Sequence, residues 1–161
     1  MEIIEANLSH VKIISELAGE IWWPTYHSII SDEQIVFMLA QMYSEKALEN
    51  QMKEGVKFLL LKFEFAYQGF TAYAQQENGK DYKLQKLYLK PSLQGKGLGK
   101  TLINEVERRV KVLGADYLYL NVNRNNTAHQ FYNKMGYEVF EEIDIPYYGF
   151  ILNDFIMRKH L

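Results

Sequence analysis

Three glycines in alternation, Gly95, Gly97 and Gly99, separate a strand-like segment from a helix-like segment near the middle of the chain. Before them, residues 84–89 alternate between apolar and polar side chains, which is typical of a strand with one buried face. After them, apolar residues recur at steps of three and four as far as Gly114, which predicts an amphipathic helix that stops there. A strand, a glycine loop and a helix must therefore follow one another directly in the fold.

This loop has the properties of a phosphate-binding loop. Glycine has no Cβ, so the backbone can approach a ligand closely, and the first N–H groups of the following helix have no partner inside it. Together with the positive end of the helix dipole, such N–H groups bind anions. Lys96 and Lys100 add positive charge. We therefore expect the backbone of residues 94–100 to hold a phosphate group; a plain turn with lysines for solubility is the alternative.

Two better-known phosphate loops do not fit this stretch. A P-loop ends in Gly-Lys-Thr, which residues 99–101 provide, but Gln94 stands where its first glycine is required. A dinucleotide fingerprint beginning at Gly95 would need glycine where Lys100 stands. A nucleotide-binding protein of either kind is therefore disfavoured. The spacing that does fit is Gln-x-x-Gly-x-Gly, beginning at Gln94.

That spacing resembles the acyl-CoA loop of the GNAT superfamily of N-acetyltransferases, and a second segment supports the resemblance. Residues 125–137 read Asn-Asn-Thr-Ala-His-Gln-Phe-Tyr-Asn-Lys-Met-Gly-Tyr. They are similar to the family's Asn-x-x-Ala-x-x-Leu-Tyr-x-x-x-Gly-Phe segment, with Phe131 in place of Leu and Tyr137 in place of Phe. A strand-like stretch at residues 117–122 lies between the two segments, in the order that the family has.

The predicted elements give an α+β fold in a single domain of residues 1–161. In order, they are a strand at 2–6, helices at 8–21 and 32–43 with a further turn or two to Met52, strands at 57–63, 65–75 and 82–89, the helix after the glycines, a strand at 117–122, a helix around Tyr132, and strands at 137–145 and 149–158. The resemblance implies a GNAT-like mixed, mostly antiparallel central sheet. It also implies about four flanking helices and a splay at the strand before the glycine loop.

Local signals set several of these boundaries. Asn7, Ser31 and Ser44 are suited to cap helices. Pro24 follows two tryptophans and predicts a loop or a broken helix, because proline cannot continue a helix interior. The Asn-Gly pair at residues 78–79 predicts a tight hairpin into the strand before the glycine loop.

Composition excludes several classes of function. The net charge of −2 and the absence of a long basic run speak against a nucleic-acid partner. The chain has no cysteine, so it can form no disulfide, thiolate metal site or cysteine nucleophile, and no spacing of carboxylates and histidines suggests a metal. Neither a signal peptide nor a membrane span is visible, so we expect no membrane association and a cytoplasmic location.

The resemblance implies which residues bind the cofactor. In the family, the strand before the loop pairs through its main chain with the pantetheine arm, and the loop holds the diphosphate. The predicted cofactor-binding residues are Leu87, Tyr88, Leu89, Gln94, Gly95, Lys96, Gly97, Leu98, Gly99, Lys100, Asn125 and Lys134. Asn125 could equally be a helix cap, and Lys134 could be only solvated.

Tyr132 matches the family tyrosine that lies near the sulfur and protonates the leaving thiolate. A phenol with an ordinary pKa of about 10 is protonated at neutral pH; a packing aromatic is the alternative.

Gln85 stands where many family members carry a glutamate that serves as the base, and an amide cannot accept that proton. The candidates for the base are Tyr26, Tyr88, Glu33 and Asp154. Alternatively, the amine arrives neutral and water carries the proton.

The predicted substrate-binding residues are Trp22, Trp23, Tyr26 and Asp154, because aromatic rings attract ammonium groups and an acid can steer a cationic amine. Residues 153–157 and the glycine loop look most like the polyamine acetyltransferase type of the family. As an alternative, the aromatic residues form core and a homodimer face.

The resemblance implies an acetyl-CoA-dependent N-acetyltransferase, with acetyl-CoA as co-substrate. The predicted reaction is transfer of the acetyl group to a primary amine of a small molecule by direct attack in a ternary complex. Two alternatives stay open. A peptide or protein N-acetyltransferase would have a wide open groove, and a catalytically silent acyl-CoA-binding module is suggested by Gln85.

Overall fold

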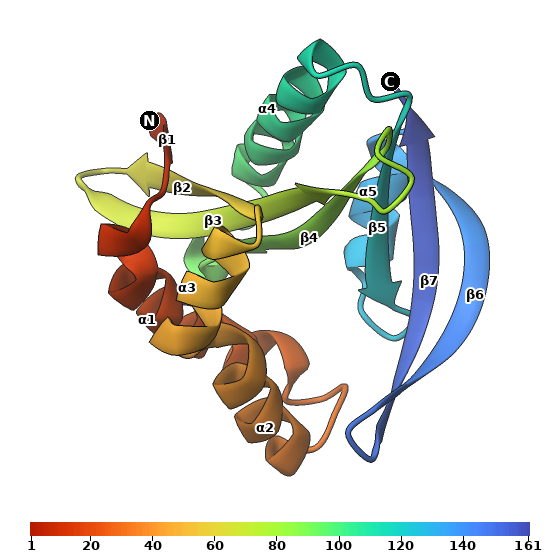
Figure 1. Ribbon diagram of the computed structural model, residues 1–161. Coiled ribbons are helices and arrows are strands. Elements are labelled where there is room, and N and C mark those ends of the chain that lie inside the picture. Colours follow the sequence, from red (N-terminus) through yellow and green to blue (C-terminus); the bar gives the residue numbers. More distant parts are fainter.

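A seven-stranded sheet crosses the molecule in the order β1-β2-β3-β4-β5-β7-β6 (Figure 1). The computed structural model describes all residues from 1 to 161. The strands are β1 (Glu2–Glu5), β2 (Lys57–Phe63), β3 (Ala66–Gln75), β4 (Tyr82–Leu89), β5 (Tyr117–Asn123), β6 (Glu138–Tyr147) and β7 (Phe150–His160). Only β4 and β5 pair in parallel; all other neighbours are antiparallel. The mixed, mostly antiparallel sheet is therefore confirmed.

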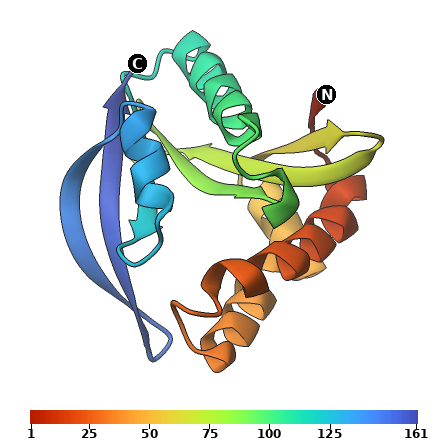
Figure 2. The ribbon, with the colours of Figure 1, turned by 180° about the vertical axis from the view of Figure 1, so that it is seen from behind.

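Five α-helices cover the two faces of the sheet (Figures 1 and 2). They are α1 (Val11–Tyr26), α2 (Asp32–Tyr43), α3 (Glu45–Lys53), α4 (Leu98–Val112) and α5 (Ala128–Lys134), with short 3-10 turns η1 (Leu8–His10) and η2 (Pro91–Leu93). Phe58 and Leu60 of β2 pack in one core with α1, α2 and α3, whereas Leu59 packs on the other face with α4 and α5. None of the helices combines the length and the apolar character that a membrane crossing requires.

The parallel ladder between β4 and β5 is only three residue pairs long. It joins Tyr82, Lys83 and Leu84 to residues 118–120 and then ends. From residue 85 onward, one edge of β4 has no strand partner, while its other edge stays paired with β3 as far as Leu89. The predicted splay before the glycine loop is therefore confirmed.

A bulge at Gln85 accompanies the end of this ladder. Opposite β4, Tyr73 pairs with Leu84 and the neighbouring Ala72 pairs with Lys86, so Gln85 is an extra residue without a partner. The bulge reverses which face the following side chains take. Leu84 packs with the α4 and α5 core, and Lys86 faces the side of α1, α2 and α3 instead of sharing the face of Leu84.

Helix capping follows the sequence signals. The side chain of Asn7 accepts a hydrogen bond from the Ser9 N–H at 2.9 Å and begins η1 and α1. Ser31 Oγ accepts from the Gln34 N–H at 3.1 Å, and Ser44 Oγ accepts from the Ala47 N–H at 3.2 Å. Ser44 thereby separates α2 from α3, which is why the structure has five helices where about four were expected.

The predicted break at Pro24 was wrong, because α1 runs through it to Tyr26. Proline removes one N–H and therefore one helical hydrogen bond, here the bond to the carbonyl of the exposed residue Glu20. In the same turn, Thr25 Oγ1 donates to the Ile21 carbonyl at 2.7 Å. Near the end of a helix the loss is tolerated, and the continued helix turns Trp22 and Tyr26 toward the sheet.

Pro146 is likewise inside an element, where a connection between strands was expected. It lies in β6 opposite Ile151. β6 is an edge strand and has a neighbour on one side only. A proline there removes no hydrogen bond from the interior of the sheet.

Candidate functional site

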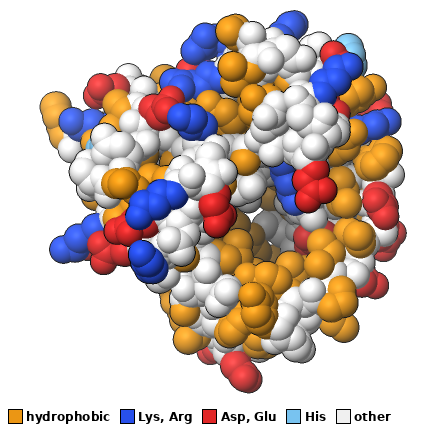
Figure 3. Space-filling view, in the orientation of Figure 1, with side chains coloured by type: hydrophobic (Ala, Val, Ile, Leu, Met, Phe, Trp, Pro, Cys, Tyr) orange, Lys and Arg blue, Asp and Glu red, His pale blue; other side chains and the backbone are white.

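A cavity of about 750 Å³ opens where β4 and β5 separate. Residues of α1, α2, β4, the glycine loop, β5, α5 and β7 line it. Figure 3 shows the molecule hollowed at this place, with hydrophobic side chains along the lower rim of the hollow. The site is thus assembled from segments that lie far apart in the sequence.

The glycine loop forms one end of the cavity, and its amides are free. The N–H groups of residues 95–100 donate to no other protein atom; the first helical bond runs from the Thr101 N–H to the Gly97 carbonyl at 3.1 Å. Gly95 and Gly97 have φ angles of +80° and +78°, a region that side chains disfavour. Six successive unpaired amides at a helix N-terminus suit an anion such as a diphosphate.

The free edge of β4 leads from this loop into the cavity. Leu87 and Leu89 point their side chains into the core with Leu98 and Leu102 of α4. The side chains of both leucines therefore belong to the core, and both residues also line the cavity. An extended ligand can pair with such an edge as an added strand would.

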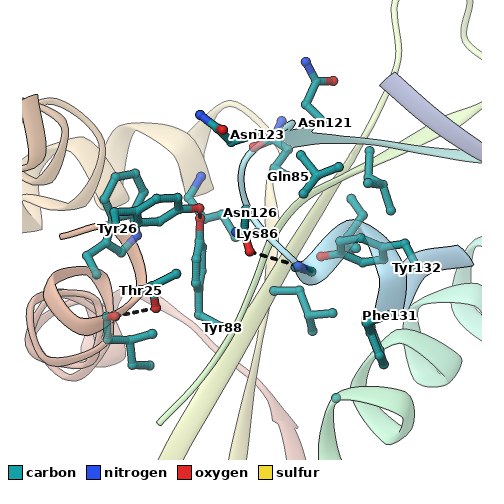
Figure 4. A pocket seen from close by; sticks show the side chains of 18 of the residues that line it. Thr25, Tyr26, Gln85, Lys86, Tyr88, Asn121, Asn123, Asn126, Phe131 and Tyr132 are labelled. Atoms are coloured by element: carbon teal, nitrogen blue, oxygen red, sulfur yellow. Dashed lines mark hydrogen bonds between the residues drawn. The ribbon is translucent and has the colours of Figure 1, made fainter. Parts of the chain in front are cut away.

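Tyr132 of α5 closes the cavity opposite β4 (Figure 4). It is 8% exposed, and its hydroxyl forms no hydrogen bond with another protein atom. Burial, with a smaller contribution from Tyr26, raises the pKa of Tyr132 well above its ordinary value. The phenol therefore stays protonated over the whole physiological pH range and can donate its proton to a group in the cavity.

Tyr26 and Tyr88 form the wall across from Tyr132, and Figure 4 shows their two hydroxyls meeting. The hydroxyl oxygens are 2.9 Å apart. Burial is the largest cause of a raised pKa at both residues. Both phenols are therefore protonated at neutral pH, so neither can serve as a base there.

A polar face lies on β5 and β7. Asn121 and Asn123 alternate along β5 with Leu120 and Val122, which pack in the core beneath α5, so the asparagines face the side of α1 and α2. Asp154 of β7 is the register partner of Asn123, and its Oδ2 accepts a hydrogen bond from Asn121 Nδ2 at 3.2 Å. Burial raises the pKa of Asp154 despite the opposing effect of that hydrogen bond.

The charged residues in the cavity lining are Lys83, Lys86, Lys100 and Asp154. Burial lowers the pKa of Lys83, and the charge of Asp154 opposes this effect. Burial and then the charge of Lys83 lower the pKa of Lys86 to about 8. No group of three His, Cys, Asp or Glu side chains is arranged to hold a metal ion.

The hairpin between β6 and β7 approaches α2 (Figure 1). Ile145 of β6 and Leu152 of β7 line the cavity there. The ring of Phe37 lies 5.5 Å from that of Tyr148 and 5.4 Å from that of Phe150, centroid to centroid. It also contacts Tyr147 at 6.2 Å, and Gln41 Nε2 donates to the Tyr148 hydroxyl at 3.4 Å. We call this group of side chains the aromatic strap.

The cavity brings together most of the residues predicted for the site. Those in its lining are Trp22, Tyr26, Leu87, Tyr88, Leu89, Gln94, Gly95, Gly97, Gly99, Lys100, Tyr132 and Asp154. Those outside it are Trp23, Lys96, Leu98, Asn125 and Lys134. Trp23 is 36% exposed, and Asn125 is an exposed residue whose N–H donates to Asn123 Oδ1 at 2.9 Å.

Sequence reasoning missed several lining residues. They include Gln34, Met38 and Met42 of α2, Lys83 and Lys86 of β4, and Asn126. Asn126 rather than Asn125 faces the cavity, and its Oδ1 accepts from the Ala128 N–H at 3.0 Å. The one signal for Lys86 was that two polar residues, Gln85 and Lys86, stand side by side in an otherwise alternating strand.

Comparison with known proteins places these features in a family context. Residues 27–145 match the model of the acetyltransferase (GNAT) domain. The spermidine N(1)-acetyltransferase of Thermoplasma acidophilum is 32% identical over 163 residues, which cover 99% of this chain and 96% of that protein. The crystal structure of the PaiA N-acetyltransferase from the same organism in complex with coenzyme A has a TM-score of 0.86 at 31% identity, covering 99% of this chain and 98% of that one.

A more distant neighbour shares the fold. The GCN5-related N-acetyltransferase of Rhodopseudomonas palustris has a TM-score of 0.84 at 20% identity, covering 99% of this chain and 95% of that one.

The residues of the present cavity fit coenzyme A. Unpaired amides at the start of α4 suit its diphosphate, and the unpaired edge of β4 suits an extended pantetheine arm.

Replacing Gly97 by Ala tests the role of the loop. A side chain at a φ of +78° strains the backbone by about 1–2 kcal/mol and tilts the amides, so we expect the Kd for coenzyme A to rise about tenfold or more. Isothermal titration calorimetry measures this directly.

Gly114→Ala is the matched control. Gly114 has a φ of +90° just after α4, so the variant carries similar strain far from the cavity. Its Kd for coenzyme A should equal that of the wild type. Equal affinities of all three proteins would contradict a diphosphate site in the loop.

Proposed function

Because the chain belongs to the GNAT family of acetyltransferases, whose acetyl donor is acetyl-CoA, we propose that it acetylates a primary amine of a small molecule. The amine attacks the thioester directly while donor and acceptor occupy the cavity together. One observation carries this proposal: free loop amides, an open β4 edge and the Tyr132 hydroxyl converge on one cavity.

We place acetyl-CoA, the acetyl donor, at the end of the cavity that the glycine loop forms. Acetyl-CoA supplies an activated thioester. The amides of residues 95–100 bind the diphosphate, and Lys100 adds a positive charge beside it. The main chain of residues 87–89 aligns the pantetheine arm along β4. Fixing the arm at both places holds the reacting carbon in one position.

Tyr132 acts as the general acid. The thiolate that leaves needs a proton, and the Tyr132 phenol has its proton available because its hydroxyl is bound to no protein acceptor. A raised pKa keeps this proton in place until the thiolate forms. The earlier idea of a catalytically silent module is disfavoured by this arrangement and by membership of the family.

Asp154 is our choice among the candidates for the base. Tyr26 and Tyr88 keep their protons at neutral pH, and Glu33 is an exposed residue outside the cavity lining. The carboxylate of Asp154 lines the cavity, and its raised pKa makes it a better proton acceptor than an ordinary aspartate. We place the acceptor ammonium against this carboxylate.

The aromatic strap favours a small acceptor over a peptide. A peptide needs a groove that is open at both ends, whereas Phe37, Tyr148 and Phe150 meet across the α2 side of the cavity. The relative named a spermidine N(1)-acetyltransferase makes polyamines obvious compounds to test. The cytoplasmic location and the homodimer stay predictions from the sequence.

The direct test measures release of free thiol from acetyl-CoA with a panel of polyamines, amino acids and aminoglycosides. We expect turnover with at least one amine, and we expect Tyr132→Phe to lower kcat by about 10²-fold or more with an unchanged Kd for coenzyme A. Tyr67→Phe, a change at a half-buried tyrosine outside the cavity, should keep full activity. Binding of acetyl-CoA without turnover of any amine would contradict the proposal.

The pH dependence of kcat/KM tests Asp154. Only the ionised carboxylate can take up a proton, so the rate should rise with pH through the pKa of Asp154, which burial places above its ordinary value. Asp154→Asn should lower kcat/KM about 10²-fold and abolish this acidic limb. Asp144→Asn is the control, because Asp144 is exposed and paired with Arg124 at 2.6 Å. If the acidic limb of the pH profile persists in Asp154→Asn, a group other than Asp154 causes it.

A further inference from the structure

Lys86 places a positive charge in the cavity wall without a negative partner. The residue is 5% exposed, and its ammonium makes one hydrogen bond, to Gln51 Oε1 of α3 at 2.8 Å. No carboxylate forms an ion pair with it, and none contributes to its pKa. A buried ammonium without an ion-pair partner is costly, so a ligand with the opposite charge would bind favourably beside it.

The bulge at Gln85 is the reason that Lys86 lies there. By regular alternation Lys86 would share the face of Leu84, toward α4. The extra residue turns it to the α1 and α2 side, where its Nζ lies 5.5 Å from the ring centroid of Tyr43 and 5.5 Å from that of Phe58. The charged end therefore lies over two aromatic rings and has no counter-charge.

The neighbours of Lys86 supply no negative charge. On its own strand lies Lys83, which is positive. From α2 comes Tyr43, whose buried phenol is protonated because its pKa is raised. Gln51 from α3 and Phe58 from β2 are uncharged. Inside the protein, one amide oxygen and two aromatic rings contact the ammonium of Lys86, and no negative charge lies beside it.

The remaining charges of the cavity divide into two groups. Lys100 belongs to the loop end, beside the amides for the diphosphate. Lys83, Lys86 and Asp154 remain for the acceptor, and neither lysine is engaged in a salt bridge. A compound with several ammonium groups would meet one acid and two like charges. A compound with one amine and one anionic group would pair with both signs.

We propose that the acceptor carries a carboxylate as well as its amine, and that Lys86, with Lys83 beside it, binds this carboxylate while Asp154 receives the ammonium. The inference rests on the function proposed above and narrows it to amino-acid-like acceptors. Lys86 is then a specificity-determining residue, because its charge raises the affinity for an anionic group and lowers the affinity for a second cationic group at the same place.

Acceptor pairs of matched chain length test this assignment. We compare ω-amino carboxylates of three to six carbons and α-amino acids with diamines, spermidine and simple monoamines, in the thiol-release assay. The wild type should have a higher kcat/KM for the carboxylates. Lys86→Met should lower that value about tenfold or more, mainly through KM, and leave the monoamine value unchanged or raised.

Two controls separate this effect from a loss of folding. Methionine has a similar length and removes a buried charge, so Lys86→Met should melt at or above the wild-type temperature. Lys111→Met changes an exposed lysine of α4 and should leave the selectivity unchanged.

Binding of pentanoate, a carboxylate that has no amine to acetylate, gives a readout independent of activity. Calorimetry in the presence of coenzyme A should show its affinity falling as the pH rises through about 8, because Lys86 then loses its proton and its charge. In Lys86→Met the affinity should be lower, and its fall through about pH 8 should be smaller than in the wild type.

Three results would overturn the inference. They are a wild type that prefers polyamines to amino carboxylates, an unchanged preference in Lys86→Met, and pentanoate binding that does not depend on Lys86. In each of these cases acetyl transfer to an amine would still stand. If no amine at all is acetylated, the proposed function itself fails, and pentanoate binding alone then decides whether Lys86 holds an anion.

Discussion

The hydrogen-bond ladder between β4 and β5 stops after Leu84 and Leu120, and the remainder of the site depends on that early end. If the two strands stayed paired, the β4 edge would be satisfied by β5 and no ligand could lie along it. Asp81 holds the paired end together, because its buried carboxylate accepts a hydrogen bond from the Tyr117 N–H at 3.1 Å. The sheet is thus fastened at one end and open at the other.

The opening has two sides with different chemistry. At the loop end, backbone amides and a helix terminus provide positive potential without burying a charged side chain. On the side of α1 and α2, charged side chains lie among aromatic, aliphatic and amide side chains, and burial shifts the pKa values of Lys86 and Asp154. The first arrangement suits the diphosphate that every donor molecule shares, and the second can distinguish one acceptor from another. Tyr132 lines the same cavity, and the proposed function gives it the role of general acid.

The sequence predicted the glycine loop and its two flanking elements because they depend on local backbone geometry. Gly95 and Gly97 have positive φ angles, and they lie between a strand and a helix. Few other local structures fit such a stretch. The motif at residues 125–137 likewise predicted that Tyr132 lies at the site, and Tyr132 lines the cavity. Cap residues such as Ser31 and Ser44 are equally local, and their hydrogen bonds are present.

The acceptor side was harder to predict because it depends on contacts between distant elements. Pro24 was expected to break α1, but the proline lies where a helix tolerates the loss of one bond. A bulge shifts alternation by one residue, so the burial of Lys86 could not be derived from period two alone. The aromatic strap joins α2 to residues more than a hundred positions away, which no local pattern reveals.

A crystal structure of the protein with coenzyme A tests the central claim most directly. The account predicts diphosphate oxygens within about 3 Å of the amide nitrogens of residues 95–100, and the sulfur beside the Tyr132 hydroxyl in the opening between β4 and β5. A diphosphate bound away from these amides, or a Tyr132 hydroxyl that faces away from the sulfur, would contradict it.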